Sequence, residues 1–232
     1  MKIELYQDLY ERFSALQITF PGDRPVAIKG LETRLIRTFG TTGGFGIFNI
    51  YLHRCLLWQR SDKPLKRITS FHGPVVPSWS WMAYMGVISY LKAPYGSVDW
   101  EPDVISPYVD DVNSDGDEPN TKGEIPRVQA VARDFVSYPA VLALGEDRWS
   151  WRVILDDPES EASRRVGERP KCVVVGKSKE EVEDGELAYY VLLITSIAAA
   201  GGSGRVWERI GVGVLRAADI DLEAEGTKLF IQ

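Results

Sequence analysis

Residues 187–195 read Leu-Ala-Tyr-Tyr-Val-Leu-Leu-Ile-Thr, an apolar run rich in aromatic and β-branched side chains. Side chains of these types favour strands, and a strand that lacks polar alternation is typically buried on both faces. We therefore expect residues 187–194 to form a strand in the centre of a sheet.

Other β-rich segments surround this strand, and turns of Gly, Pro and Asp separate them. Together they predict about eight short strands, a number typical of a β-barrel or sandwich. The remaining predicted strands cover residues 78–82, 87–91, 128–135, 151–155, 171–176, 206–215 and 228–231. The charged stretches 159–168 and 177–186 are predicted to be solvated hairpins or loops.

Two helices are predicted ahead of the strands. Apolar side chains that recur every three or four positions predict an amphipathic helix over residues 3–16, and they include Leu5, Leu9, Phe13 and Leu16, joined by Tyr6 and Tyr10. A second helix is expected to begin after Asp23, which can cap free amides, and to end at Gly40. The short apolar run 50–58 fits a helix or a strand equally well.

The fold class that follows is mainly β (α+β), a barrel or sandwich with an N-terminal pair of helices. The chain has 232 residues, of which 44% are hydrophobic and 26% charged, enough for one large core. We expect a single domain over residues 1–232, with a helical head (1–40) and a β-rich body (41–232). The body carries an acidic loop at 99–126.

Charge and composition exclude several partner classes. The net charge is −6, and the arginines at 34, 37, 54 and 60 are scattered among apolar residues, which argues against a nucleic-acid surface. No apolar run approaches the roughly 20 residues that span a bilayer. Two cysteines are too few for a disulfide framework. The sequence therefore predicts a cytoplasmic protein without nucleic-acid or membrane partners.

No metal or cofactor is expected. Asp111, Asn113 and Asp115 match the first ligand positions of a calcium loop, but Lys122 stands where a bidentate Glu is required. The glycine-rich stretch 43–46 lacks the Gly-Lys-Ser/Thr ending of a nucleotide-binding loop.

Residues 77–86 read Pro-Ser-Trp-Ser-Trp-Met-Ala-Tyr-Met-Gly. If this stretch is a strand, Trp79 and Trp81 lie on one side and Ser78 and Ser80 on the other, because successive side chains alternate. Two interpretations remain open: an aromatic ridge that fills a core, or the wall of an apolar ligand cavity.

Glu208 and Arg209 are neighbours in a predicted strand, so they should point to opposite faces. One of the two charges is then directed inward and needs a partner or a ligand. A structural ion pair is the expected role of that inward charge.

Several motifs together resemble the region that follows the HET domain in fungal heterokaryon-incompatibility (HET) proteins. They are Leu-Leu-Trp at 56–58, Pro-Ser-Trp-Ser-Trp at 77–81, residues 23–31 and residues 207–213, and the resemblance runs from about Leu16 to Gly213. HET proteins are associated with non-self recognition and programmed cell death. Their signalling is attributed to an upstream TIR-like domain that this sequence lacks, so no catalytic residue of that domain can be assigned here.

Two functional hypotheses follow. In the first, the chain is a stand-alone HET-like module that binds an apolar small molecule. It acts as a cofactor-independent cyclase or isomerase, a pericyclase of the Diels-Alderase type, in fungal secondary metabolism. The substrate-binding wall would comprise Trp58, Trp79 and Trp81, and the polar catalytic groups would be His53, Arg54 and Tyr84.

In the second hypothesis, the chain is a non-catalytic sensor or protein-interaction module of HET-type cell-death signalling. Its partner would be another protein, with a full-length HET protein as the candidate. The resemblance favours this role more directly, whereas the 25 aromatic residues (7 Trp, 10 Tyr and 8 Phe) motivate the first.

Overall fold

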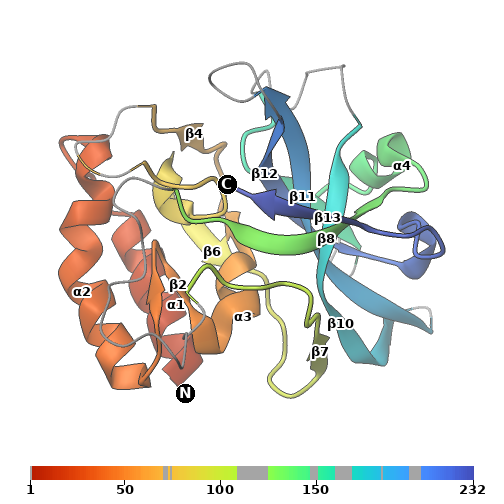
Figure 1. Cartoon of the computed structure of the whole chain (residues 1–232), viewed down its shortest axis with the longest axis horizontal. Coiled ribbons are helices and arrows are strands. Elements are labelled where there is room, and N and C mark those ends of the chain that lie inside the picture. The colour runs from red at the N-terminus through yellow and green to blue at the C-terminus, as the bar shows by residue number, and fades with distance from the viewer. Residues whose placement is uncertain are drawn as a thin grey trace.

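Five strands close into a barrel in the computed structural model (Figure 1). They are hydrogen-bonded in the order β11–β10–β8–β13–β12, and β12 returns to β11. The β12–β13 pair is parallel and the other pairs of the ring are antiparallel. The five strands are β8 (Val128–Asp134), β10 (Lys171–Glu183), β11 (Glu186–Ala198), β12 (Arg205–Leu215) and β13 (Thr227–Ile231). The predicted mainly β fold with a barrel is confirmed.

The structure describes residues 2–69, 73, 75–108, 125–146, 151–159, 169–183, 185–198 and 205–232. The calcium-like part of the predicted acidic loop, residues 110–122, lies outside these ranges. So do nearly all residues of the charged stretch 159–168.

Strand β11 occupies the central position that its apolar run predicted. It pairs with β10 on one edge and with β12 on the other, so that Leu192 faces Val173 and Val212 across the two ladders. Side chains on one face of β11, such as Leu192, enter the main core that also contains the indoles. Those on the other face, such as Leu193, enter a second core beneath α4 (Tyr138–Leu142).

The charged stretch 177–186 forms a hairpin, which is one of the two structures predicted for it. Residues 177–183 continue strand β10, with register shifts along its ladder with β11, and so form a hairpin with paired strands. The short strand β7 (Val98–Trp100) pairs with β10 at residues 176–178. A Cβ atom at Gly176 would lie 2.7 Å from the Trp100 ring, so glycine permits this close approach.

Both predicted helices are present as α1 (Lys2–Ser14) and α2 (Arg24–Phe39). Gly40 ends α2 in the left-handed conformation, with φ of 63°, and its N–H bonds to the carbonyl groups of Ile36 and Arg37. Asp23 makes no side-chain cap, because the 3₁₀ turn η1 (Pro21–Asp23) leads directly into α2.

The buried face of α1 carries the two tyrosines of the predicted pattern, whereas two of its leucines lie outside the core. Ile3, Tyr6 and Tyr10 are buried, and the two tyrosine rings pack against Phe48. Leu5 and Leu16 are exposed instead, by 49% and 59%. Leu9 and Phe13 are partly buried and pack against the same core.

The ambiguous run 50–58 contains both kinds of structure. A 3₁₀ turn η2 (Asn49–Tyr51) leads into the short helix α3 (Leu52–Leu56), and strand β3 (Trp58–Arg60) follows. Strand β3 pairs with β6 (Ile88–Tyr90), which lies beside α1. Figure 1 shows this region between the two long helices and the barrel.

The predicted strand at 78–82 is wrong. Residues 78–79 form a turn, and Trp81–Ala83 form the 3₁₀ helix η3, whose cap is the Ser80 hydroxyl accepting from the Met82 amide at 3.2 Å. Strand β5 (Tyr84–Met85) then pairs with β4 (Lys66–Arg67).

The remaining elements are β1 (Gly43–Gly44), paired with β2 (Ile47–Phe48), and β9 (Arg152–Leu155), paired with β12. The turn η4 (Ala217–Asp219) lies between β12 and β13. In the described part of the chain, every helix is too short or too polar to cross a membrane.

Candidate functional site

The three indoles of the predicted cavity wall are buried in the main core. Trp58 and Trp79 are 0% exposed and Trp81 is 1% exposed. The Trp58 indole N–H donates to the Trp79 carbonyl oxygen at 2.8 Å, and the Trp79 indole N–H donates to the Pro126 carbonyl oxygen at 3.3 Å. Two of the three rings therefore have polar partners that hold them in one orientation.

Trp79 and Trp81 do not share one face, because the turn at η3 removes the strand alternation. The Trp81 ring lies 5.2 Å from the Tyr10 ring and 6.1 Å from the Phe13 ring, both on α1. Trp79 instead contacts Phe45, with ring centroids 6.4 Å apart. The two indoles thus fill different parts of the interior.

Tyr84 is the one predicted catalytic group that lies against an indole of the wall. Its ring is 5.5 Å from the Trp58 ring, and its hydroxyl donates to the Arg209 carbonyl oxygen at 3.4 Å. Burial raises the pKa of Tyr84 to about 12. The hydroxyl therefore stays protonated at neutral pH.

His53 and Arg54 lie elsewhere, against residues 93–101. The His53 ring stacks on Trp100 at 5.5 Å, and its Nε2 lies 2.8 Å from the Glu101 carbonyl oxygen. Arg54 donates to the carbonyl oxygens of Ala93 and Pro94. The structure thus brings Trp58, Trp79 and Tyr84 together and places these two polar groups apart from them.

The burial of His53 predicts how the stability of the fold depends on pH. Burial lowers the pKa of His53 from its ordinary value near 6.5, although the Glu101 carbonyl opposes the shift. The unfolded chain then binds a proton more readily than the folded chain, so stability falls as the pH falls below about 6.5.

The measurement is urea unfolding between pH 8 and pH 5, on the natural protein and on His53→Gln. We expect the variant to lose less stability over this range than the natural protein. The prediction fails if the two curves fall in parallel, because carboxylates common to both proteins would then explain the whole effect.

A buried ion pair that the sequence did not identify as a pair joins the barrel to the indoles. Arg209 of β12 is 1% exposed and donates to both carboxylate oxygens of Asp156, at 3.0 and 3.1 Å. Its guanidinium lies 3.4 Å from the Trp58 ring centroid and also donates to the carbonyl oxygens of Leu56 and Trp58. This confirms the expected inward charge and its structural ion pair.

Ser78 of the tryptophan motif extends the same network. Its hydroxyl oxygen accepts from the Arg209 backbone N–H at 2.9 Å and donates to the Gln232 carbonyl oxygen. The motif therefore connects β12 and the residue after β13 with the layer of aromatic side chains. Because these groups are enclosed and hydrogen-bonded, their role here is structural.

The two cysteines are buried and are not activated as nucleophiles. Cys55 and Cys172 are fully buried, and burial raises the pKa of each thiol to about 12. Cys172 packs in the second core beside Val174 and Leu193. No group of three or more His, Cys, Asp or Glu in the described part of the chain is arranged to hold a metal ion.

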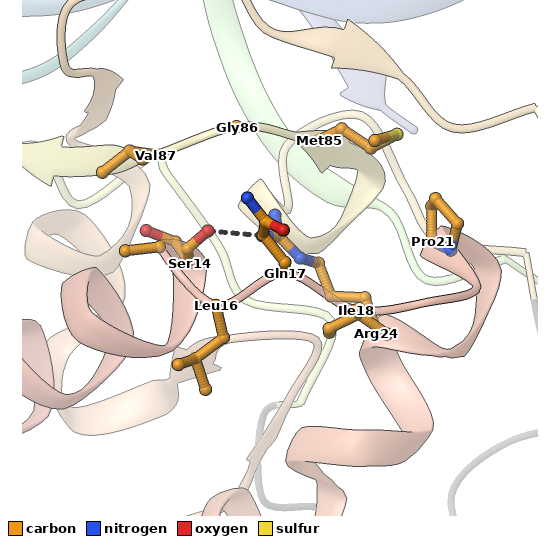
Figure 2. Close-up of a pocket in the computed structure, with 10 residues that line it drawn as sticks. Ser14, Leu16, Gln17, Ile18, Pro21, Arg24, Met85, Gly86 and Val87 are labelled. Carbon is orange, nitrogen blue, oxygen red and sulfur yellow. Dashed lines mark hydrogen bonds between the residues drawn. The ribbon is translucent and has the colours of Figure 1, made fainter.

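Among the described residues, a surface groove lies between the end of α1 and the segment that joins β5 to β6 (Figure 2). We call it the α1–β5 groove. Its volume is about 470 Å³. It is lined by residues 14–18, Pro21, Arg24 and residues 85–87.

Two further grooves are formed by described residues. One, of about 380 Å³, lies beside Arg54 and Tyr90, and the other, of about 410 Å³, lies beside Glu32 and Tyr108. Of the six predicted site residues, only Arg54 lines any of the three grooves. Sequence reasoning missed the α1–β5 groove, because Leu16 was assigned to the predicted helix, whereas α1 ends at Ser14 and Leu16 lines the groove.

Comparison with models of protein families, with curated proteins and with solved structures finds no match to this chain. The resemblance to the region after the HET domain therefore stays a prediction.

Proposed function

We propose that the chain is a non-catalytic protein-recognition module of the HET type, and that the α1–β5 groove is its contact surface. The observation that supports this proposal is the set of large apolar side chains exposed around the groove. Leu16 is 59% exposed, Phe20 60%, and Met85 and Val87 44% each. Leu16, Met85 and Val87 line the groove, and Phe20 lies between the lining residues Ile18 and Pro21 in the sequence.

An exposed apolar patch of this kind is typical of a surface that another protein covers. Single apolar residues on a surface need no explanation, but these side chains gather around one hollow. Met and Phe are also enriched at interfaces, because they bury a large area, and Met in addition adapts to different partners.

The cyclase hypothesis receives no comparable support. It requires apolar walls around a substrate, and Trp58, Trp79 and Trp81 contact other protein groups while lining none of the three grooves. It stays a prediction that no contact among the described residues favours. The resemblance implies a full-length HET protein in the cytoplasm of a fungal cell as the partner of the recognition module.

Photo-crosslinking tests the proposal. A photoreactive benzoyl-phenylalanine is incorporated at Val87, and the protein is produced and irradiated in cells of its source organism. The matched control carries the same group at Val136, which is 66% exposed between β8 and α4. Helix α4 lies on the far side of the barrel from α1 and α2 (Figure 1).

We expect a discrete crosslinked product from Val87, which mass spectrometry identifies as a HET protein, and no such product from Val136. The proposal is overturned if Val87 gives no product, or if the two positions give the same products.

A further inference from the structure

Arg24, the first residue of α2, carries a buried positive charge at the α1–β5 groove. It is 5% exposed and lines the groove. Its guanidinium donates to the carbonyl oxygens of Tyr84 and Ser14, the second at 2.8 Å, and lies 5.3 Å from the Trp81 ring centroid. Figure 2 shows the bond to Ser14 as a dashed line, with the Gln17 side chain drawn beside it at the centre of the groove.

These neighbours are uncharged. None of the ion pairs among the described residues includes Arg24. Burial lowers the pKa of Arg24 to about 10, and no acidic group contributes to that shift. Arg209 offers the contrast within this chain, because its equally buried guanidinium is paired with Asp156.

A buried charge without a counter-ion is costly, and proteins usually supply one. A guanidinium has five N–H donors, and the two hydrogen bonds to carbonyl oxygens leave others for a ligand. A carboxylate suits this position best, because it accepts charge-assisted hydrogen bonds from arginine in a paired geometry. The charge and the apolar rim together define the chemistry of the occupant.

We propose that the α1–β5 groove binds a peptide segment of a partner protein in which an Asp or Glu carboxylate pairs with Arg24. Apolar side chains on either side of that carboxylate then lie against Leu16, Met85 and Val87. The Gln17 amide, which lines the same groove, donates a second hydrogen bond to the carboxylate. This inference rests on the proposed recognition function and adds the chemistry of the partner.

A peptide segment suits this surface better than a free amphipathic acid does. Phe20 precedes the lining residue Pro21 and Val26 follows Arg24 by two positions, and these two side chains are 60% and 59% exposed. A single small molecule in a groove of about 470 Å³ would leave these side chains in water. A protein partner covers the groove and the adjoining surface together.

NMR titration of the full ¹⁵N-labelled chain tests the inference. The probe is the blocked tripeptide acetyl-Leu-Glu-Leu-amide, taken to millimolar concentration, and its matched control carries Gln in place of Glu. The Arg24 side-chain Nε–H and the backbone amides of Gln17 and Gly86 are the reporters. Octanoate, titrated separately, represents a small-molecule acid.

With the Glu peptide we expect saturable shifts of all three reporters. The Gln peptide should bind about tenfold more weakly, the loss expected when a charge-assisted hydrogen bond becomes a neutral one. Equal binding of the two peptides, no shift with either, or tighter binding of octanoate than of the Glu peptide would each overturn the inference.

Two variants complete the test. Arg24→Gln removes the charge and should abolish the preference for Glu over Gln. Because this variant also disturbs contacts to Ser14 and Tyr84, Leu16→Asp provides a second one, which repels the Glu peptide without touching Arg24. Val136→Asp, far from the groove, is the control that should bind normally.

Failure of the carboxylate inference is distinguishable from failure of the proposed recognition function. If Val87 crosslinks to a HET protein while the two peptides bind alike, the surface recognises a partner without using the charge of Arg24. If Val87 gives no crosslink, the recognition function itself is wrong.

Discussion

Asp156→Asn is expected to lower the free energy of unfolding by about 3–5 kcal/mol, because it leaves the Arg209 charge buried without a counter-ion. The Arg209 side chain has no exposed surface, so water cannot replace the lost carboxylate. The change also weakens the link between β12 and the Trp58 ring. Urea unfolding followed by tryptophan fluorescence measures the loss.

Two control variants test whether the loss of stability comes from the buried ion pair itself. Glu208→Gln removes a neighbouring carboxylate whose ion pair with Arg67 is partly exposed, and should cost less than about 1 kcal/mol. The double variant Asp156→Leu with Arg209→Met should recover much of the loss, since burial raises the pKa of Asp156 more than Arg209 lowers it. Near-natural stability of Asp156→Asn alone would contradict the account.

Trp81→Ala is expected to lower the free energy of unfolding by about 3–5 kcal/mol, the usual cost of removing a large aromatic side chain from a core. The cavity would open between α1 and η3, where the indole packs against Tyr10 and Phe13. The packing there is tight, since a Cβ atom at Gly46 would lie 2.6 Å from the indole nitrogen. Guanidinium unfolding measures the effect.

The matched control is Met85→Ala, which shortens an exposed side chain on the rim of the groove. Because Met85 is 44% exposed, this variant should cost under about 1 kcal/mol. If Trp81→Ala instead keeps natural stability, the indole borders open space. That result would contradict the packed core and support the interpretation of these tryptophans as a cavity wall.

The elements with strong local patterns could be predicted from the sequence. The apolar run 187–194 placed the central strand because burial on both faces leaves no polar alternation. Gly40 ended α2 because only glycine adopts its left-handed backbone at little cost. Alternation in β12 sent Arg209 inward and required a partner for it.

Features set by long-range contacts could not be predicted. Barrel closure depends on the pairing of β11 with β12 and of β12 with β13, and no local pattern distinguishes it from a sandwich. Asp156 lies 53 positions from Arg209, and a single Asp after a strand gives no local signal of an ion pair. The strand predicted for residues 78–82 failed because the Ser80 hydroxyl caps a 3₁₀ turn there.

In the candidate site, too, local patterns could be predicted and long-range contacts could not. The tryptophan motif stands out in the sequence, but the choice between a core and a cavity wall depends on α1, which approaches Trp81 from a distant part of the chain. The groove was not predicted because it forms where the end of α1 meets the β5–β6 segment, about 70 residues later. The role of Arg24 became apparent only from the structure, in which its guanidinium is buried and belongs to none of the ion pairs among the described residues.

The central claim is that the indoles and the barrel form one tightly packed interior, which leaves recognition to the surface. Native-state hydrogen exchange of the Trp58 indole N–H, which donates to the Trp79 carbonyl oxygen at 2.8 Å, tests it most directly. We expect exchange only through global unfolding, with the same free energy and the same denaturant dependence as the unfolding transition. Rapid exchange that is independent of denaturant would show that space opens locally around the indoles, and would contradict the claim.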